Sequence, residues 1–108
     1  MARFDAATSV EGQRADVALS GECDLAAREH CMEALMTAVG SARTVVVDLA
    51  ELRFIDSSGV HALVTAHRAA VERGGRLNVV NAGGMVAHVL DITGVGGLLS
   101  PRDGARDG

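Results

Sequence analysis

The residues most suited to carry out chemistry are Asp-Ser-Ser-Gly at 56–59, which lie where an apolar run ends and a helical pattern begins. Three β-branched valines at 45–47 favour a buried strand before them, and acidic and hydroxyl side chains satisfy free N–H groups at a helix start. A helix N-terminus also favours negative charge, so a phosphate attached there would be stabilised by backbone donors and the helix dipole. Ser57 and Ser58 are therefore both candidate phosphorylation sites.

Other kinds of chemistry at this cluster find less support. The Gly-x-Ser-x-Gly elbow of hydrolases is absent, because no glycine stands two residues before either serine. No glycine-rich nucleotide loop follows a strand, so a partner would have to hold any phosphoryl donor. Asp56 could accept a phosphoryl group as in two-component receivers, but the chain has no lysine and lacks the expected acidic pair. An ordinary capped helix start is the structural alternative.

The histidines and cysteines predict no metal site and no other cofactor. The four histidines are His30, His61, His67 and His88. They fall on three expected helices, and none is paired with another His or Cys at a metal-binding spacing. His67 lies on an apolar stripe and is expected to be hydrogen-bonded and half-buried. Cys23 and Cys31 match neither a redox pair nor a zinc motif, so buried free thiols are expected.

Length and composition predict a single domain. The 108 residues are 48% hydrophobic, which suffices for one modest core, and that core must be aliphatic because there is no Trp or Tyr. A net charge of −4 and the lack of a basic stretch argue against nucleic acid as a partner. No apolar run approaches a signal-peptide core or the ~20 residues of a membrane span. We therefore expect a soluble protein of the cytoplasm with no membrane partner.

Strands are predicted to alternate with helices. A turn at 11–13 indicates a hairpin between the stretch 3–10 and the first strand with clear alternation. That alternating strand is expected at 15–20, a central strand at 44–49 and a short apolar strand at 76–80. Helices are expected at 25–39 (with Asp24 as N-cap), at 58–73 and at 85–90. This order predicts a single α/β domain with a mostly parallel, mixed sheet of four to five strands, an antiparallel edge and helices packed against it.

Each expected helix carries an apolar stripe. In the first helix the residues that recur at mainly three- and four-residue steps are Leu25, Arg28, Met32, Leu35, Met36 and Val39. In the second the stripe comprises Val60, Leu63, Val64, His67 and Val71. In the third it comprises Met85, Val86, Val89 and Leu90. These side chains are predicted to face the sheet.

The chain carries three motifs in this order: Gly-Glu-Cys-Asp at 21–24, Asp-Ser-Ser-Gly at 56–59 and Leu-Asp-Ile-Thr-Gly-Val at 90–95. Together they resemble the motifs of the STAS family, and more narrowly those of bacterial anti-sigma-factor antagonists. The likeness covers residues 8–99, and the lack of membrane spans separates the chain from the STAS domains of anion transporters. It implies a STAS domain over residues 1–99, followed by a flexible C-terminal tail at 100–108.

The resemblance implies partner switching in the regulation of transcription. The unphosphorylated antagonist binds an anti-sigma factor, itself a serine kinase with a histidine-kinase-like ATP fold, and thereby releases a sigma factor. Phosphorylation ends this binding, and a metal-dependent serine phosphatase restores the free serine. In the family the acceptor directly follows the aspartate, which makes Ser57 the acceptor here and the chain a substrate rather than an enzyme. Asp56 is expected to orient this hydroxyl, and Asp24 to line the docking surface.

The remaining partner-binding residues that the resemblance implies are Glu22, Ser58, Gly59 and His61. Cys23 replaces the Leu or Ile that is typical of the first motif, a change that packing can tolerate. His61 stands where the family often has a small residue, which gives the hypothesis that its titratable ring tunes partner selection; an exposed histidine without a role is the alternative. The short tail implies that the final C-terminal helix of many relatives is missing or truncated.

Two other functions stay open from the sequence. One is a STAS scaffold that binds partners without being phosphorylated. The other is a small ligand-binding α/β domain, which would require a pocket with convergent polar groups beside Ser57.

Overall fold

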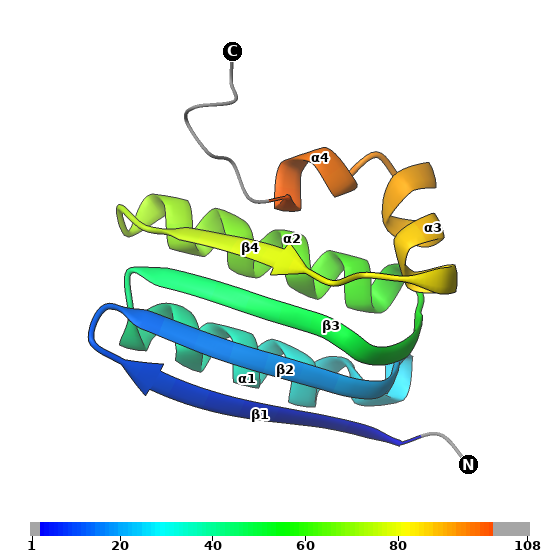
Figure 1. Cartoon of the computed structure of the whole chain (residues 1–108), viewed down its shortest axis with the longest axis horizontal. Helices are drawn as coiled ribbons and strands as arrows, with labels where there is room; N and C mark the ends of the chain where they lie inside the picture. Colours follow the sequence, from blue (N-terminus) through cyan, green and yellow to red (C-terminus); the bar gives the residue numbers. More distant parts are fainter. Residues whose placement is uncertain (1–2, 101–108) are drawn as a thin grey trace.

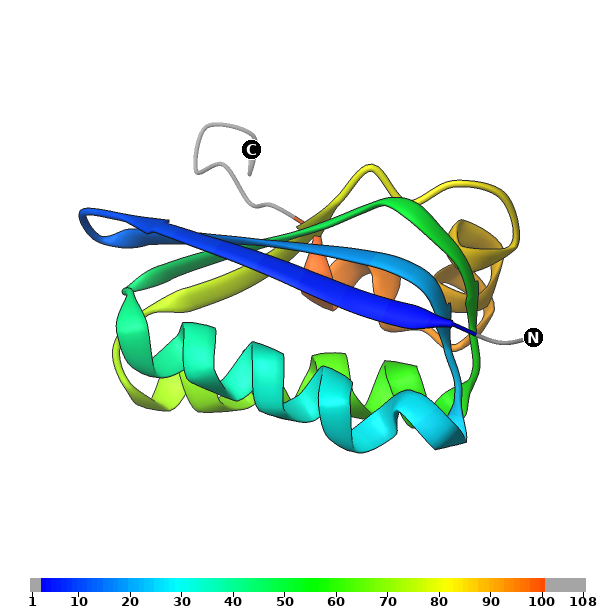
Figure 2. The same ribbon diagram turned by 90° about the horizontal axis from the view of Figure 1, so that it is seen from below.

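A four-stranded mixed sheet in the order β1-β2-β3-β4 forms one layer of the molecule, and two long helices cover one of its faces (Figures 1 and 2). The computed structural model describes residues 3–100. In chain order its elements are β1 (Phe4–Glu11), β2 (Arg14–Cys23), the 3-10 turn η1 (Leu25–Ala27), α1 (Arg28–Ser41), β3 (Thr44–Ile55), α2 (Ser57–Glu72), β4 (Arg76–Val80), α3 (Gly84–Ile92) and α4 (Gly96–Leu99). The expected α/β domain with a mixed sheet is confirmed.

The first two strands form the expected hairpin at one edge of the sheet. β1 pairs antiparallel with β2 without interruption, from Phe4 opposite Gly21 to Glu11 opposite Arg14. The connecting turn is short, and Gly12 adopts a φ of 61°, in the left-handed region that glycine enters at little cost. β3 runs parallel to both β2 and β4, so α1 and α2 return the chain across the same face of the sheet (Figure 2).

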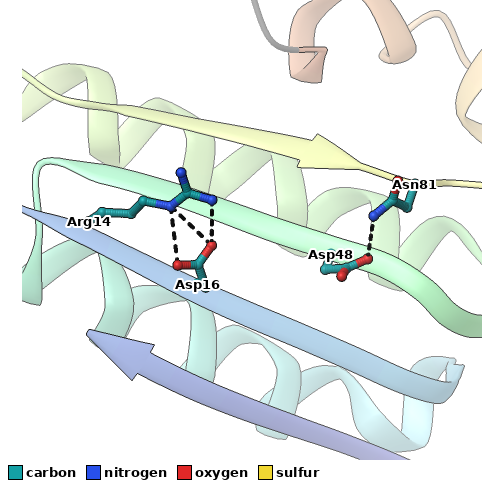
Figure 3. Close-up of polar contacts among 4 residues, drawn as sticks. All are labelled: Arg14, Asp16, Asp48 and Asn81. Atoms are coloured by element: carbon teal, nitrogen blue, oxygen red, sulfur yellow. Dashed lines mark hydrogen bonds and ion pairs between the residues drawn. The ribbon is translucent and has the colours of Figure 1, made fainter. Parts of the chain in front are cut away.

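Alternation along the strands separates a buried face of the sheet from an open one. The buried side chains of β3 on the helix side are Val45, Val47, Leu49, Leu52 and Ile55. On the open face, the Arg14 guanidinium donates to the Asp16 carboxylate at 2.8 Å, and the Asn81 amide donates to Asp48 at 3.1 Å (Figure 3). The second face of the sheet therefore carries polar side chains, and the two long helices do not pack against it.

Two strands extend beyond their predicted ends. β3 runs to Ile55 rather than to Leu49, and β2 runs to Cys23 rather than to Ser20. Two register shifts between these strands interrupt the simple alternation on which a sequence prediction depends. The first helix also differs from its predicted range of 25–39, because its first turn is the 3-10 turn η1 and α1 continues to Ser41.

Some residues of the predicted apolar stripes are exposed. Val71 is 54% exposed, whereas its neighbour Ala70 is buried. Val71 follows the buried Leu63 by eight residues and so lies roughly 80° around the helix, while Ala70 follows it by seven and lies only about 20° away. Met36 is 38% exposed for the same reason, since it lies about 100° around α1 from the buried Leu35.

The last element within residues 3–100 is the short helix α4. α4 is only four residues long, and the Ser100 hydroxyl donates to the carbonyl of Gly96 at 2.6 Å to close it. Of the tail expected at 100–108, residues 101–108 lie outside the described part of the chain. No helix within residues 3–100 is long and apolar enough to cross a membrane.

Candidate functional site

Two strand-to-helix turns lie side by side at one end of the sheet. β2 leads into η1 through Asp24, and β3 leads into α2 through Asp56. Because β2 and β3 are parallel and Cys23 is in register with Ile55, both turns lie at the carboxyl ends of these two neighbouring strands. The backbone N–H of Asp56 donates to the carbonyl of Cys23 at 3.3 Å and joins the two turns directly.

The two aspartates hold their turns in the same way. Asp24 has φ −115° and ψ −170°, and Asp56 has φ −119° and ψ −169°. Asp24 Oδ1 accepts a hydrogen bond from the Ala27 N–H at 3.2 Å. Asp56 Oδ1 accepts from the N–H groups of Ser58 at 2.9 Å and Gly59 at 3.4 Å. Both side chains are N-caps, as the sequence predicted for Asp24 and for the Asp-Ser-Ser cluster.

Ser57 is the first residue of α2 and is exposed. Ser58 is half-buried, and His61 is exposed one helical turn beyond Ser57, on the same side of α2. No hydrogen bond engages the Ser57 hydroxyl within residues 3–100. The structure therefore brings Ser57, His61 and the Asp24 turn to one end of the molecule and leaves the Ser57 hydroxyl accessible.

Two sequence-based expectations about this turn differ from the structure. Asp56 was expected to orient the Ser57 hydroxyl, but its Oδ1 caps the backbone of α2, and no hydrogen bond joins the two side chains within the described residues. A phosphate at Ser57 was expected to gain from free N–H donors, but Asp56 already occupies those of Ser58 and Gly59. A phosphoserine would consequently stand beside a carboxylate that has taken its nearest donors.

Gly59 allows α2 to approach the end of β2 closely. A Cβ at this position would lie 2.6 Å from Ile55 Cγ1 and 2.8 Å from Cys23 Sγ. Gly59 is itself buried, so it supports the turn from beneath, whereas Ser57 lies on its surface. The glycine of the Asp-Ser-Ser-Gly motif is thus required by packing.

Cys23 and Cys31 are free thiols buried under the two turns, as expected. The contact with the Cys31 thiol, together with burial and the nearby charges of Asp56 and Asp24, raises the pKa of the Cys23 thiol above its usual range. Cys23 consequently stays protonated and acts as a small apolar side chain. It is fully buried and belongs to the hydrophobic core.

One residue of the Asp24 turn lies in a different environment from the one that the sequence pattern predicted. Leu25 was expected on the apolar stripe of the first helix but is 70% exposed, because it begins a 3-10 turn instead of an α-helical face. Glu22 is half-buried and lies on the strand face opposite to Cys23. A shallow hollow beside this turn is lined by Arg3, Phe4, Glu22, Asp24, Ala26, Ala27 and His30.

The other titratable side chains do not join this site. His67 is half-buried, and its Nδ1 lies 3.1 Å from the carbonyl oxygen of Leu77, which confirms the expected hydrogen-bonded histidine. Within residues 3–100, no three His, Cys, Asp or Glu side chains gather in a group that could hold a metal ion.

The chain is similar to proteins of known structure over most of its length. A family model described as "Mlab, STAS domain" matches residues 6–100. The anti-sigma factor antagonist SpoIIAA in its unphosphorylated form is 26% identical, with a TM-score of 0.67 and 83% of each chain covered. The phosphorylated form of the Bacillus cell fate determinant SpoIIAA is also 26% identical, with a TM-score of 0.70, covering 92% of this chain and 89% of that one.

A third structure shares the fold at lower identity. An anti-sigma factor antagonist from Mycobacterium paratuberculosis is 21% identical, with a TM-score of 0.80, covering 93% of this chain and 87% of that one. No curated protein sequence gives a significant match. The family match includes both capped turns, most of the hairpin and all three longer helices. The chain therefore belongs to the STAS domain family, and its fold is that of anti-sigma factor antagonists such as SpoIIAA.

Proposed function

We propose that this chain is a cytoplasmic anti-sigma-factor antagonist that binds an anti-sigma serine kinase and is inactivated by phosphorylation at Ser57. The observation that carries the proposal is the exposed Ser57 hydroxyl, which lies at the start of α2 beside the Asp24 turn. Similarity to SpoIIAA, whose structure has been solved in unphosphorylated and phosphorylated forms, supports the same reading.

The geometry favours Ser57 over Ser58 as the acceptor. Ser57 is exposed, whereas Ser58 is half-buried and its N–H is bound by Asp56. In the transfer, the Ser57 Oγ would attack the γ-phosphorus of ATP held by the kinase and lose its proton, with ADP as the leaving group. The kinase supplies the nucleotide site and the catalytic groups, and a serine phosphatase reverses the modification by hydrolysis.

Phosphorylation would act on the docking surface through charge and bulk. A phosphoserine carries about −1.5 to −2 charges at neutral pH. Asp56 and Asp24 already place two carboxylates at the joined turns, and the N–H donors of Ser58 and Gly59 are occupied. A partner surface shaped for a neutral hydroxyl would meet repulsion and a desolvation cost, so affinity falls without refolding of the domain.

Intact mass measurement after incubation with a cognate kinase and ATP tests the proposal. We expect one phosphoryl group on the wild type and on Ser58→Ala, and none on Ser57→Ala. Circular dichroism of each variant controls for folding. Modification of Ser57→Ala but not of Ser58→Ala would contradict the assignment of the acceptor.

A pull-down of the kinase, combined with the mass measurement, distinguishes the two alternatives. A STAS scaffold would bind the kinase in a pull-down yet gain no mass. A ligand-binding domain would recover no kinase, and the structure gives that reading little support, because the hollow beside Asp24 includes no residue of the Ser57 turn.

A further inference from the structure

Within residues 3–100, the outer edge of β1 pairs with no other strand. β1 is eight residues long and pairs with β2 without a bulge, and its five central residues, 6–10, carry no charge and no proline. Natural edge strands are usually shortened, bulged, charged or covered, since free N–H and C=O groups pair with other strands. The opposite edge of the sheet is formed by β4 (Figure 1). β4 has only five residues, and its Asn78 amide donates to the Ser100 carbonyl that follows α4.

The hydrogen-bonding groups on this edge can be assigned from the hairpin. The Glu22 N–H donates to the Arg3 carbonyl at 2.7 Å, and donors alternate along an antiparallel ladder, so the odd-numbered residues of β1 exchange bonds with β2. The N–H and C=O groups that point away from β2 belong to Phe4, Ala6, Thr8 and Val10. Four evenly spaced residues are thus available to a further antiparallel strand.

The side chains of β1 are divided between the two faces of the sheet. Phe4 lies on the helix side, because its ring packs edge-on against His30 of α1 with centroids 5.2 Å apart. The even-numbered residues therefore share the helix side, where Val10 is 50% exposed, and the odd-numbered residues lie on the open face. Arg3 and Glu11 are exposed there and form no ion pair within residues 3–100; the neighbouring Arg14 is bound to Asp16 instead (Figure 3).

We propose that β1 pairs antiparallel with β1 of a second copy of this chain, around a two-fold axis at Ala7. In this register Phe4, Ala6, Thr8 and Val10 exchange hydrogen bonds with Val10, Thr8, Ala6 and Phe4 of the second copy. On the open face, Arg3 lies opposite Glu11 of the second copy at both ends of the interface. On the helix side, Phe4 covers the exposed Val10 of the second copy.

Charge favours this register over the one with its two-fold axis at Thr8, and an axis at Ala6 would place Arg3 opposite Ser9 and lose the ion pairs. A two-fold axis at Thr8 would use the same outward groups, but it would place Asp5 opposite Glu11 at both ends, and like charges directly opposite destabilise a strand pair. The Ala7 register replaces these two repulsions with two Arg–Glu attractions. The two sheets would then continue into one another, and both open edges would be covered.

Crosslinking through one introduced cysteine tests the register directly, because the native thiols of Cys23 and Cys31 are buried. Residue 7 meets its own copy in a non-hydrogen-bonded pair with Cα atoms about 4.5 Å apart, a spacing that a disulfide can bridge. We expect Ala7→Cys to form a disulfide-linked dimer under a mild thiol oxidant. In this reaction each of the two thiols loses its proton, and the oxidant takes up the two electrons. Ser9→Cys is the matched control, because it lies on the same face but opposite Asp5. Equal crosslinking of both variants, or of neither, would overturn the register.

Charge reversal measured by sedimentation equilibrium gives an independent test. Arg3→Glu and Glu11→Arg should each raise the dimer dissociation constant by about tenfold or more, because two attractions become repulsions. The double reversal should restore dimerisation. It still places an arginine at position 11 opposite Arg14 in the hairpin, so any loss of hairpin stability is the same as in Glu11→Arg. A wild-type chain that stays monomeric at every concentration measured, or a double variant as weak as the single ones, would refute the proposal.

Discussion

Asp24 and Asp56 have the same backbone conformation to within a few degrees and cap two turns that are joined by the hydrogen bond from the Asp56 N–H to the Cys23 carbonyl. They are 32 positions apart in the sequence, yet both follow the carboxyl ends of the neighbouring parallel strands β2 and β3. Two N-caps with the same backbone conformation thus support the joined turns beside Ser57.

Removing these caps should destabilise the domain unequally. Asp24→Ala should lower the free energy of unfolding by about 1 kcal/mol, and Asp56→Ala by about 1–2 kcal/mol, because Asp56 satisfies two N–H groups and Asp24 only one. Asn at either position should retain most of the stability, since its amide oxygen also caps. Urea denaturation measures the difference. An unchanged midpoint for Asp56→Ala would show that the cap contributes nothing.

Gly59→Ala should destabilise the fold through overpacking. The added methyl would lie 2.6 Å from Ile55 and 2.8 Å from Cys23, and relief of such contacts typically costs about 1–3 kcal/mol. Gly40→Ala is the matched control, because Gly40 lies in α1 with no atom within 4 Å of the added Cβ. That control should be neutral or stabilising by up to about 1 kcal/mol. Thermal unfolding compares the two, and equal melting temperatures would contradict this account of Gly59.

Ser57→Asp should weaken binding to the kinase. The added carboxylate stands beside Asp56 and imitates part of the charge of a phosphate, so we expect the dissociation constant to rise about tenfold or more. Circular dichroism should stay unchanged, because Ser57 is exposed. Calorimetric titration of the kinase measures the affinity. Equal binding by wild type and variant would exclude switching by charge.

Leu25 should contribute to docking without contributing to stability. It is 70% exposed in the turn beside Ser57, and an apolar side chain in that position can be buried by a partner. Leu25→Ser should raise the dissociation constant for the kinase about tenfold and leave the free energy of unfolding within about 0.5 kcal/mol. Val71→Ser is the control, since Val71 is 54% exposed near the other end of α2. The same loss of affinity in both variants would rule out a specific contact at Leu25.

His61 should influence which kinase is bound. Its ring is exposed one turn beyond Ser57, where it would meet a partner that docks over the hydroxyl. His61→Gly should change the relative affinities for several kinases, whereas Arg68→Gly, at another exposed position of α2, should lower stability similarly without changing them. Identical binding profiles for wild type and His61→Gly would leave His61 without a role in selection.

Local patterns in the sequence determined much of this protein. The order of strands and helices, the glycine turn of the hairpin, the extent of β4 and the cap at Asp24 all follow from residues that are neighbours in the chain. Each of these features depends on local backbone preference or on short-range periodicity, which a sequence records directly.

Only the tertiary structure decided how the site is assembled. The parallel pairing of β2 with β3 places Asp24 beside Asp56, and register shifts in that pair carry β3 on to Ile55. The close approach of α2 to Cys23 leaves no room for a side chain at position 59. The 3-10 turn leaves Leu25 exposed. These features depend on contacts between segments far apart in the chain, and the energy of such contacts is absent from any local pattern.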